Sequence, residues 1–277
     1  MSRSNASFVS QYGPWAVVTG ASNGIGRAFA IELAKRGFAL VLVARNLEAL
    51  EALATELETR HRTEVRIIAQ DLQPEGAADA LSQDVADLDV GLLVSAAGFG
   101  SSGEFVKSDL AEEVGMVDVN CRATVTLARL MAPRMITRGK GGLVLMSSLL
   151  AFQGTPRSAN YAATKAFVQT FAEGLYHELK PLGVDVVACA PGPISSGFAA
   201  RADMQMSMSE KPDVVAAETL DALGRRLTVR PGWLSKFLEF SLCFLPRWGR
   251  VRMMGVVMGG MTRHQRGKKI DQNTQPA

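Results

Sequence analysis

The sequence has few cysteines and few histidines, and none of them form a group. The three cysteines and three histidines are Cys121, Cys189, Cys243, His61, His177 and His264. With no CxxC or Cys/His cluster, the pattern argues against a disulfide framework and a metal site, and for a reducing compartment. The first fifteen residues, MSRSNASFVSQYGPW, lack the apolar run of a signal peptide. We therefore expect a cytoplasmic protein that needs no metal.

Aromatic residues make up only 6% of the 277 residues, while 47% are hydrophobic and 21% are charged. This composition is ordinary for a soluble globular protein with a large core. The net charge of +3 is unevenly distributed, because eleven Lys/Arg between Arg225 and Ala277 stand against only Glu239 and Asp271. We expect no nucleic-acid partner.

The basic end of the chain also contains an apolar segment at 233–261, WLSKFLEFSLCFLPRWGRVRMMGVVMGGM. Charged residues and a proline interrupt it too often for a membrane span of about 20 residues. A pair of amphipathic helices explains the pattern better. These helices either cover a pocket or a subunit interface, or lie on an anionic lipid surface.

Short apolar runs alternate with helical patterns along the chain. The expected strands are Trp15–Thr19, Ala39–Ala44, Val65–Ala69, Val90–Val94, Leu143–Met146 and Val184–Ala188. The expected helices are Gly24–Arg36, Leu47–Arg60, Glu75–Ala86, Asp109–Arg138 and Ser158–Lys180. Nearly continuous apolar strands are typical of a sheet covered on both faces, so the alternation predicts one parallel, doubly wound α/β domain.

We divide the chain into an N-terminal tail at 1–13, a catalytic domain at 14–228 and a helical, basic extension at 229–277. The domain includes a loop at 193–211 that is rich in Pro, Gly, Ser and Met. Because loops after the carboxyl ends of strands bind ligands in such folds, this one is a candidate substrate lid. A helix at Asp213–Arg226 follows, with Pro212 suited to its first turn. The methionines of DMQMSMSE either line a hydrophobic pocket or pack the start of that helix.

A glycine-rich stretch, TGASNGIGRAFA, follows the first strand directly. Gly20 permits a tight turn, and the absent side chains of Gly24 and Gly26 let a pyrophosphate approach the N-terminus of the next helix. Between the first strand and the first helix of a βαβ unit, this triplet predicts dinucleotide binding.

The second strand ends in VLVARN, where a site for NAD usually carries an acidic residue for the ribose. Ala44 and Arg45 stand there instead, so a 2′-phosphate would meet a guanidinium. This predicts NADP(H). The alternative, that Arg45 only caps a strand end in solvent, explains the arginine but not the missing acid.

The segment ANYAATKAF places Tyr161 and Lys165 four residues apart, on one face of a helix. Either a surface lysine lies beside a partly buried tyrosine by chance, or the ammonium lowers the pKa of the phenol and the pair moves protons. Small residues let this helix pack closely, on the sheet or on its counterpart in a second subunit: Ala159, Ala162, Ala163 and Ala166.

Over Trp15–Ser196 the chain resembles the short-chain dehydrogenase/reductase family. The motifs that carry the resemblance occur in the family's order: Thr19–Gly26, Asp71-Leu72, SAAG at Ser95–Gly98, Asn120, Ser148, Tyr161 with Lys165, and Pro191–Ser196. The resemblance implies a single Rossmann-like sheet, NADP(H) as cofactor, a small carbonyl or alcohol substrate, and a homodimer or homotetramer.

The resemblance also implies site residues. The catalytic set is Asn120, Ser148, Tyr161 and Lys165, where Ser148 is preferred to Ser147 because the family's serine lies thirteen residues before the tyrosine. The cofactor contacts are Gly20, Ser22, Asn23, Gly24, Ile25, Gly26, Arg45, Asp71, Leu72, Ala97, Gly98, Tyr161, Lys165, Pro191, Gly192 and Ile194. Asp71 and Leu72 would lie at the adenine, and Ile194 at the carboxamide.

Two departures from the family are visible. Ser95 and Ala96 replace the usual pair of asparagines, which alters a hydrogen bond to the central strand, although the hydroxyl of Ser95 can still bond locally. The family's Asp-Gly-Gly turn near the end is missing, and VRPGWLSKFLEF stands in that region. Substrate and subunit contacts of other members therefore do not carry over.

The function expected from these residues is an NADP(H)-dependent oxidoreductase that transfers a hydride between nicotinamide and the carbonyl or secondary alcohol of a hydrophobic substrate. Tyr161 would be the acid/base, Ser148 would donate to the substrate oxygen, and Asn120 would hold a water that links Lys165 to solvent. The alternatives are a non-catalytic NADP(H)-binding scaffold and a lipid ketone reductase on a membrane surface.

Overall fold

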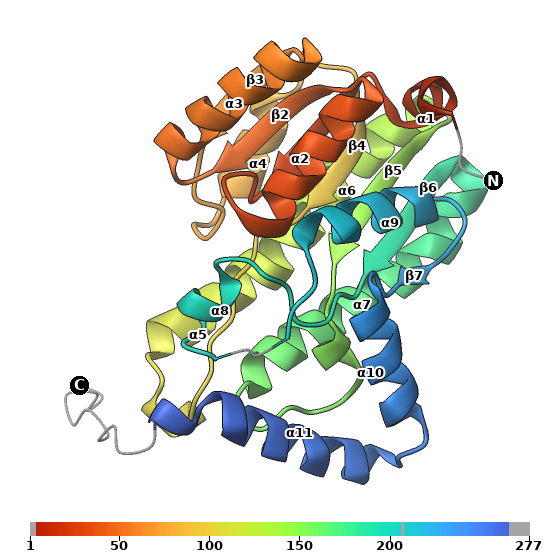
Figure 1. Ribbon diagram of the computed structural model, residues 1–277. Helices are drawn as coiled ribbons and strands as arrows, with labels where there is room; N and C mark the ends of the chain where they lie inside the picture. The colour runs from red at the N-terminus through yellow and green to blue at the C-terminus, as the bar shows by residue number, and fades with distance from the viewer. Residues whose placement is uncertain (1–3, 206–207, 266–277) are drawn as a thin grey trace.

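The computed structural model describes residues 4–205 and 208–265, and its centre is a seven-stranded sheet (Figure 1). The strand order is β3-β2-β1-β4-β5-β6-β7, and every neighbouring pair is parallel. The strands are β1 (Trp15–Thr19), β2 (Ala39–Ala44), β3 (Val65–Ala69), β4 (Val90–Ser95), β5 (Gly141–Met146), β6 (Val184–Cys189) and β7 (Thr228–Val229). The expected doubly wound, Rossmann-like sheet is confirmed.

Some of the helices cover both faces of this sheet. The described helices are α1 (Asn5–Tyr12), α2 (Gly24–Arg36), α3 (Leu47–His61), α4 (Ala77–Asp84), α5 (Leu110–Val117), α6 (Thr124–Thr137), α7 (Ala159–Leu179), α8 (Phe198–Arg201), α9 (Pro212–Ala222), α10 (Trp233–Cys243) and α11 (Arg247–Met261). One core cluster joins α1, α2, α3 and α9 to the sheet, and a second joins α4, α6 and α7 to the opposite face.

The strands are apolar throughout because both of their faces are buried. In β1, Ala16 and Val18 belong to the first core cluster, while Val17 between them belongs to the second. Alternate residues of a strand point to opposite faces, so burial on both sides requires apolar residues at every position.

Strand β1 pairs with β2 on one side and β4 on the other, so the chain reverses its direction of winding here. In a doubly wound fold, the crevice at this reversal, outside the carboxyl ends of the strands, is where ligands bind. The glycine-rich turn after β1 and the SAAG motif at the end of β4 both lie at this edge.

The helix expected at Asp109–Arg138 is interrupted in the structure. Between α5 and α6, residues Asp118–Ala123 form a π-helix, and Asn120 lies within it. A π-helical turn is rare and often marks a functional site, because its wider backbone repositions a side chain. Periodicity in the sequence does not reveal it.

The segment expected as an N-terminal tail is partly folded onto the core. Within α1, Phe8 and Tyr12 are buried, and their rings pack together with Phe38. The hydroxyl of Tyr12 donates to Asp185 Oδ2 at 2.7 Å, which joins α1 to β6. Residues Asn5–Tyr12 are therefore part of the packed body of the molecule.

The loop at 193–211 carries the short helix α8 and is held at its two ends. Ser195 N donates to Glu210 O at 2.8 Å, and Glu210 N donates to Pro193 O at 2.9 Å. Helix α9 begins at Pro212, one residue before the expected start, with the proline in its first turn as predicted, and it ends at Ala222, four residues earlier than predicted. Met206 and Ser207 lie outside the described residues.

Helices α10 and α11 form the expected helical pair of the extension. Figure 1 shows them at the blue end of the chain, away from the layers that cover the sheet. Among the residues that the structure describes, no helix is long and apolar enough to cross a membrane.

We predict that Phe8→Ala lowers the free energy of unfolding by about 3–5 kcal/mol, because it empties a fully packed site in the core. Ser7→Ala, on the exposed side of the same helix, is the matched control and should change it by less than about 0.5 kcal/mol. Urea denaturation of both variants measures the difference. Equal, small effects would mean that α1 does not contribute to the core.

Candidate active site

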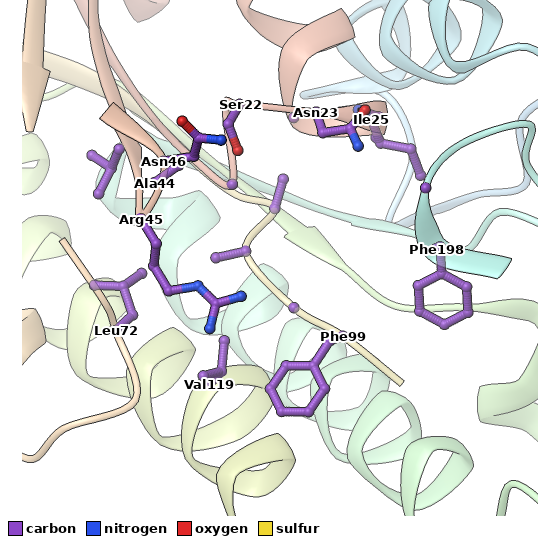
Figure 2. Close-up of a pocket in the computed structure, with 18 of the residues that line it drawn as sticks. Ser22, Asn23, Ile25, Ala44, Arg45, Asn46, Leu72, Phe99, Val119 and Phe198 are labelled. Atoms are coloured by element: carbon purple, nitrogen blue, oxygen red, sulfur yellow. The ribbon is translucent and has the colours of Figure 1, made fainter. Parts of the chain in front are cut away.

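Two adjoining cavities lie at the carboxyl edge of the sheet. The first, of about 520 Å³, is lined by the turn after β1, the end of β2 and the residues after β3 and β4 (Figure 2). The second, of about 370 Å³, lies between the end of β5, α7, the 193–211 loop and helices α10 and α11. Both cavities share Ile25, Ala96, Gly98, Ser196 and Phe198. Ligands in the two cavities would therefore meet near Gly98.

The site residues expected from the sequence are distributed over these cavities. The first is lined by Gly20, Ser22, Asn23, Gly24, Ile25, Gly26, Arg45, Asp71, Leu72, Ala97 and Gly98. The second is lined by Ser148, Tyr161, Lys165, Pro191, Gly192 and Ile194. Asn120 lines neither cavity and lies behind Gly98.

The turn between β1 and α2 is shaped for close approach of a ligand. Gly20 and Gly24 have positive φ angles of 70° and 56°. A Cβ on Gly20 would lie 2.9 Å from the backbone of Ala97, and one on Gly26 would collide with Gly20 O. Asn23 caps α2 by accepting from Gly24 N at 2.7 Å, and the first turn of α2 has no acidic residue. These features fit the pyrophosphate of a dinucleotide, since free N–H groups and the helix dipole favour an anion.

The end of β2 carries a cation where an acid would mark an NAD site. In Figure 2, the side chain of Arg45 extends from this strand end into the cavity. Arg45 Nη1 lies 3.8 Å from Asp71 Oδ2, and both side chains are partly exposed. Asn46, which sequence reasoning missed, also lines the cavity and caps α3 by accepting from Ala49 N at 3.0 Å. This arrangement fits a 2′-phosphate better than a free 2′-hydroxyl.

The two serines after β5 point in different directions. Ser147 Oγ donates to Lys165 O at 3.2 Å, so it binds the backbone of α7. The hydroxyl of Ser148 accepts from Leu150 N at 3.2 Å, lies close enough to Tyr161 to lower the pKa of the phenol, and lines the second cavity. The structure therefore places Ser148, rather than Ser147, beside the phenol.

Tyr161 and Lys165 are both buried on α7. Lys165 Nζ donates to Met146 O at 2.8 Å and lies 5.7 Å from the centre of the Tyr161 ring. Burial lowers the pKa of Lys165 to about 8, since an ammonium is costly to desolvate. The lysine is thus close to losing its proton near neutral pH.

The expectation that Lys165 lowers the pKa of Tyr161 is wrong for the chain by itself. Burial raises the pKa of Tyr161 to about 12, and the hydrogen bond from Ser148 only partly opposes this. Desolvation of the phenolate is the largest cause of this shift, and the Lys165 ammonium donates to Met146 O. At neutral pH the phenol therefore keeps its proton and can donate it.

Asn120 is held firmly in the π-helix and is almost fully buried. Its Nδ2 donates to Phe99 O at 2.9 Å and to Thr164 Oγ1 at 3.0 Å, and its Oδ1 accepts from Phe99 N at 3.1 Å. A Cβ on Gly98 would lie 2.8 Å from Asn120 Oδ1 and 3.5 Å from Lys165 Nζ. The amide thus fixes the chain after β4 close to the lysine. That Asn120 holds a water remains a prediction.

Other hydrogen bonds hold the end of β4 at the position where the family usually has an asparagine and this chain has Ser95. Ser95 Oγ shares a hydrogen bond with Thr124 Oγ1 at 3.1 Å, which joins β4 to α6. Thr19 Oγ1 accepts from Ala96 N at 3.0 Å and from Ala97 N at 2.9 Å. The Ser95 hydroxyl is therefore hydrogen-bonded, but to a residue of α6 rather than locally as expected.

Several residues of the site were missed from the sequence. The Phe198 ring on α8 lies 5.1 Å from the Tyr161 ring, and the Arg201 guanidinium lies 4.6 Å over the Phe99 ring. These contacts join segments about forty and one hundred residues apart, and no local pattern indicates them.

Helices α10 and α11 form much of the second cavity. Their lining residues are Leu234, Leu238, Ser241, Leu242, Met253, Met254, Val257, Met258 and Met261. Met204 and Met208 of the loop also line it. The interpretations that the extension covers a pocket, and that loop methionines line one, are confirmed for these residues. The regular spacing of Leu and Met along the extension is the feature of the sequence from which this lining could be predicted.

A family model of short chain dehydrogenases matches residues 14–207. The chain belongs to the short-chain dehydrogenase/reductase family.

Relatives of this dehydrogenase span most of its length. A 7beta-hydroxysteroid dehydrogenase from Clostridium sardiniense is 33% identical over 238 residues, which cover 83% of this chain and 89% of the relative. A very-long-chain 3-oxoacyl-CoA reductase from Meyerozyma guilliermondii is 31% identical over 255 residues, 86% of this chain and 74% of the relative. A solved short-chain dehydrogenase from Sphingobium yanoikuyae in complex with NADPH has a TM-score of 0.76 and 29% identity, covering 96% of this chain and 99% of that one.

We predict that Lys165→Met stabilises the protein at pH 7 by about 1–2 kcal/mol. The pKa of Lys165 in the folded chain, about 8, lies below its ordinary value of 10.5, so burial of the ammonium costs stability. That cost is fully present below pH 8 and disappears as the pH rises to about 10.5.

The gain from Lys165→Met should therefore shrink over the same interval. Denaturant titrations of both proteins at several pH values measure it. A variant that is less stable than the wild type at pH 7 would show that Lys165 stabilises the fold.

Proposed function

We propose that this dehydrogenase is an NADP(H)-dependent reductase of a hydrophobic ketone or aldehyde, with Tyr161 as the acid/base. The observation that carries the proposal is the second cavity, which is lined largely by Leu and Met and contains Ser148, Tyr161 and Lys165. It meets the dinucleotide-shaped first cavity at Gly98. A carbonyl beside Tyr161 would thus lie next to a nicotinamide.

The residues of the chain act on the carbonyl oxygen. NADPH, bound by the glycine turn and Arg45, would supply the hydride that the carbonyl carbon receives. Tyr161 donates its proton to the oxygen as the new C–H bond forms, and the hydroxyl of Ser148 donates a hydrogen bond to the same oxygen. The product is a secondary or primary alcohol, and Tyr161 is left as a phenolate.

Lys165 would then help to return the proton that Tyr161 has given up. Its pKa of about 8 suits this role, because the group gains and loses a proton near neutral pH. The raised pKa of Tyr161 favours the protonated form that reduction requires.

Support for NADP(H) over NAD(H) comes from Arg45 and from the absence of an acid at the end of β2 in the described structure. The similar dehydrogenase from Sphingobium yanoikuyae was solved with NADPH.

A hydrophobic substrate is supported by the composition and size of the second cavity. About 370 Å³ lies within the usual range for pockets that bind small apolar ligands. The relatives named for hydroxysteroids and very-long-chain 3-oxoacyl-CoA also favour a steroid-like or long-chain carbonyl. A non-catalytic scaffold has no specific observation in its favour, because the tyrosine, lysine and serine lie together in the cavity.

The location and assembly expected from the sequence stay proposals. We propose a cytoplasmic protein that forms a homodimer or homotetramer through α7, on which Phe167 is an exposed apolar residue.

We predict that the wild type oxidises NADPH with a graded set of ketones, and that kcat/KM rises along straight-chain methyl ketones from butanone to dodecanone. Tyr161→Phe should lower kcat/KM about 100- to 10,000-fold, since it removes the proton donor, while NADPH binding is retained. The absorbance of NADPH measures turnover, and its fluorescence measures binding.

Tyr176→Phe makes the same substitution later on α7 and should leave both readouts unchanged. If Tyr161→Phe kept its full activity, the role assigned to Tyr161 would be wrong. If no ketone in the set were reduced by the wild type, the substrate class would be wrong.

We predict that Arg45→Ala lowers kcat/KM with NADPH about 10- to 100-fold and leaves it unchanged with NADH, because a charge-assisted contact to the 2′-phosphate is lost. Arg60→Ala, an exposed arginine at the other end of α3, is the matched control. An equal loss with both coenzymes would contradict the assignment of Arg45.

A further inference from the structure

Helices α10 and α11 are apolar on two sides. Their inner side lines the second cavity, while a different set of large residues faces solvent. We call this set the outer face: Trp233, Phe237, Phe240, Phe244, Trp248 and Val256. Between 58% and 74% of each of these residues is exposed. Exposed aromatic residues gathered on two adjacent helices are unusual for a surface that meets only water.

The spacing along α10 separates the two sides. Trp233, Phe237, Phe240 and Phe244 recur every three or four residues and so form one stripe on the helix. The cavity residues Leu234, Leu238 and Leu242 form a second stripe, about a third of a turn away. The cavity therefore accounts for the inner stripe alone, and the residues of the outer stripe are largely exposed in the described structure.

The outer face lies in a strongly basic region. Residues 225–265 contain eight Lys/Arg and one acidic residue, Glu239. Glu239 is already paired with Arg230 at 2.7 Å. Arg247 and Arg252 are exposed on α11 beside Trp248, and within the described residues neither makes an ion pair. The partner of this face should be both apolar and anionic.

A second copy of the chain does not fit this description well. A two-fold interface would bring the same patch of each subunit together, so the net positive charge of one patch would meet that of the other. Like charges placed together across an interface are costly. A bilayer with anionic lipids instead offers hydrocarbon for the aromatic rings and phosphate groups for the arginines.

The second cavity also reaches the surface at this place. Met253 and Val257 of α11 line the cavity, yet 45% and 40% of these residues are exposed. An apolar molecule could thus pass from the side of the outer face toward Tyr161 along methionine and leucine side chains.

We propose that the outer face of α10 and α11 docks on the surface of an anionic lipid bilayer, and that the second cavity opens toward that bilayer. Docking does not depend on the reaction. The delivery of a lipid-like substrate through this opening rests on the proposed function.

Co-sedimentation with vesicles tests the docking directly. The full chain should bind vesicles of phosphatidylcholine mixed with phosphatidylglycerol, bind pure phosphatidylcholine more weakly, and lose affinity for the anionic vesicles as salt is added. Failure to bind the anionic vesicles would overturn the proposal.

Variants separate the apolar and electrostatic contributions. Phe244→Ser/Trp248→Ser should bind both kinds of vesicle at least about tenfold more weakly, because two large side chains no longer enter the lipid. Arg247→Gln/Arg252→Gln should weaken binding to anionic vesicles about fivefold per arginine and leave binding to phosphatidylcholine unchanged. Leu182→Ser is the control, since Leu182 is exposed just before β6, at the opposite edge of the sheet.

Two further measurements keep the interpretations apart. If the wild type sediments without lipid as a dimer and Phe244→Ser/Trp248→Ser as a monomer, the outer face is a subunit interface and the proposal is wrong.

The same variant should keep the wild-type kcat/KM with butanone in buffer and show a higher KM with dodecanone held in anionic vesicles. If the protein binds vesicles but reduces no ketone, the docking proposal stands and the proposed function is refuted. If it reduces ketones but does not bind vesicles, the proposed function stands and the docking proposal is refuted.

Discussion

The buried ammonium of Lys165 is the interaction on which the candidate site depends. Its hydrogen bond to Met146 O joins α7 to the end of β5, and the adjacent Ser147 bonds back to the carbonyl of Lys165. This pair of contacts holds Ser148 against Tyr161 at the floor of the second cavity. Burying the ammonium is unfavourable for folding at neutral pH, while burial of the phenol keeps Tyr161 protonated and able to donate.

The rest of the fold forms a binding site for a second ligand next to Lys165 and Tyr161. The carboxyl ends of β1, β2 and β4 form the first cavity, and the glycine turn leaves room where any side chain would strike backbone. Asn120, in its π-helical turn, fixes the chain after β4 between the two cavities. Leucine and methionine side chains of the extension line the rest of the second cavity. The polar groups of Ser148, Tyr161 and Lys165 therefore lie at one side of an otherwise apolar pocket.

Much of this arrangement could be predicted from the sequence, because it depends on local patterns. Alternating apolar runs located the six longer strands, and the spacing of Gly20, Gly24, Gly26, Tyr161 and Lys165 is set by the turn or helix that carries them. What was missed depends on packing between distant segments: the burial of Phe8, the contact of Phe198 with Tyr161, and the π-helical turn. The direction of the Tyr161 pKa was wrong for the same reason, since spacing reveals a neighbouring lysine but not the loss of solvent around the phenol.

The central claim is that a carbonyl beside Tyr161 receives a hydride from NADPH. The most direct measurement is mass spectrometry of the alcohol formed from dodecanone when the enzyme is supplied with NADPH that carries deuterium at both hydrogen positions of C4 of the nicotinamide. The account predicts one deuterium per product molecule, bound to the carbinol carbon, with the wild type. Product without deuterium at that carbon, or no product with any of the ketones, would contradict it.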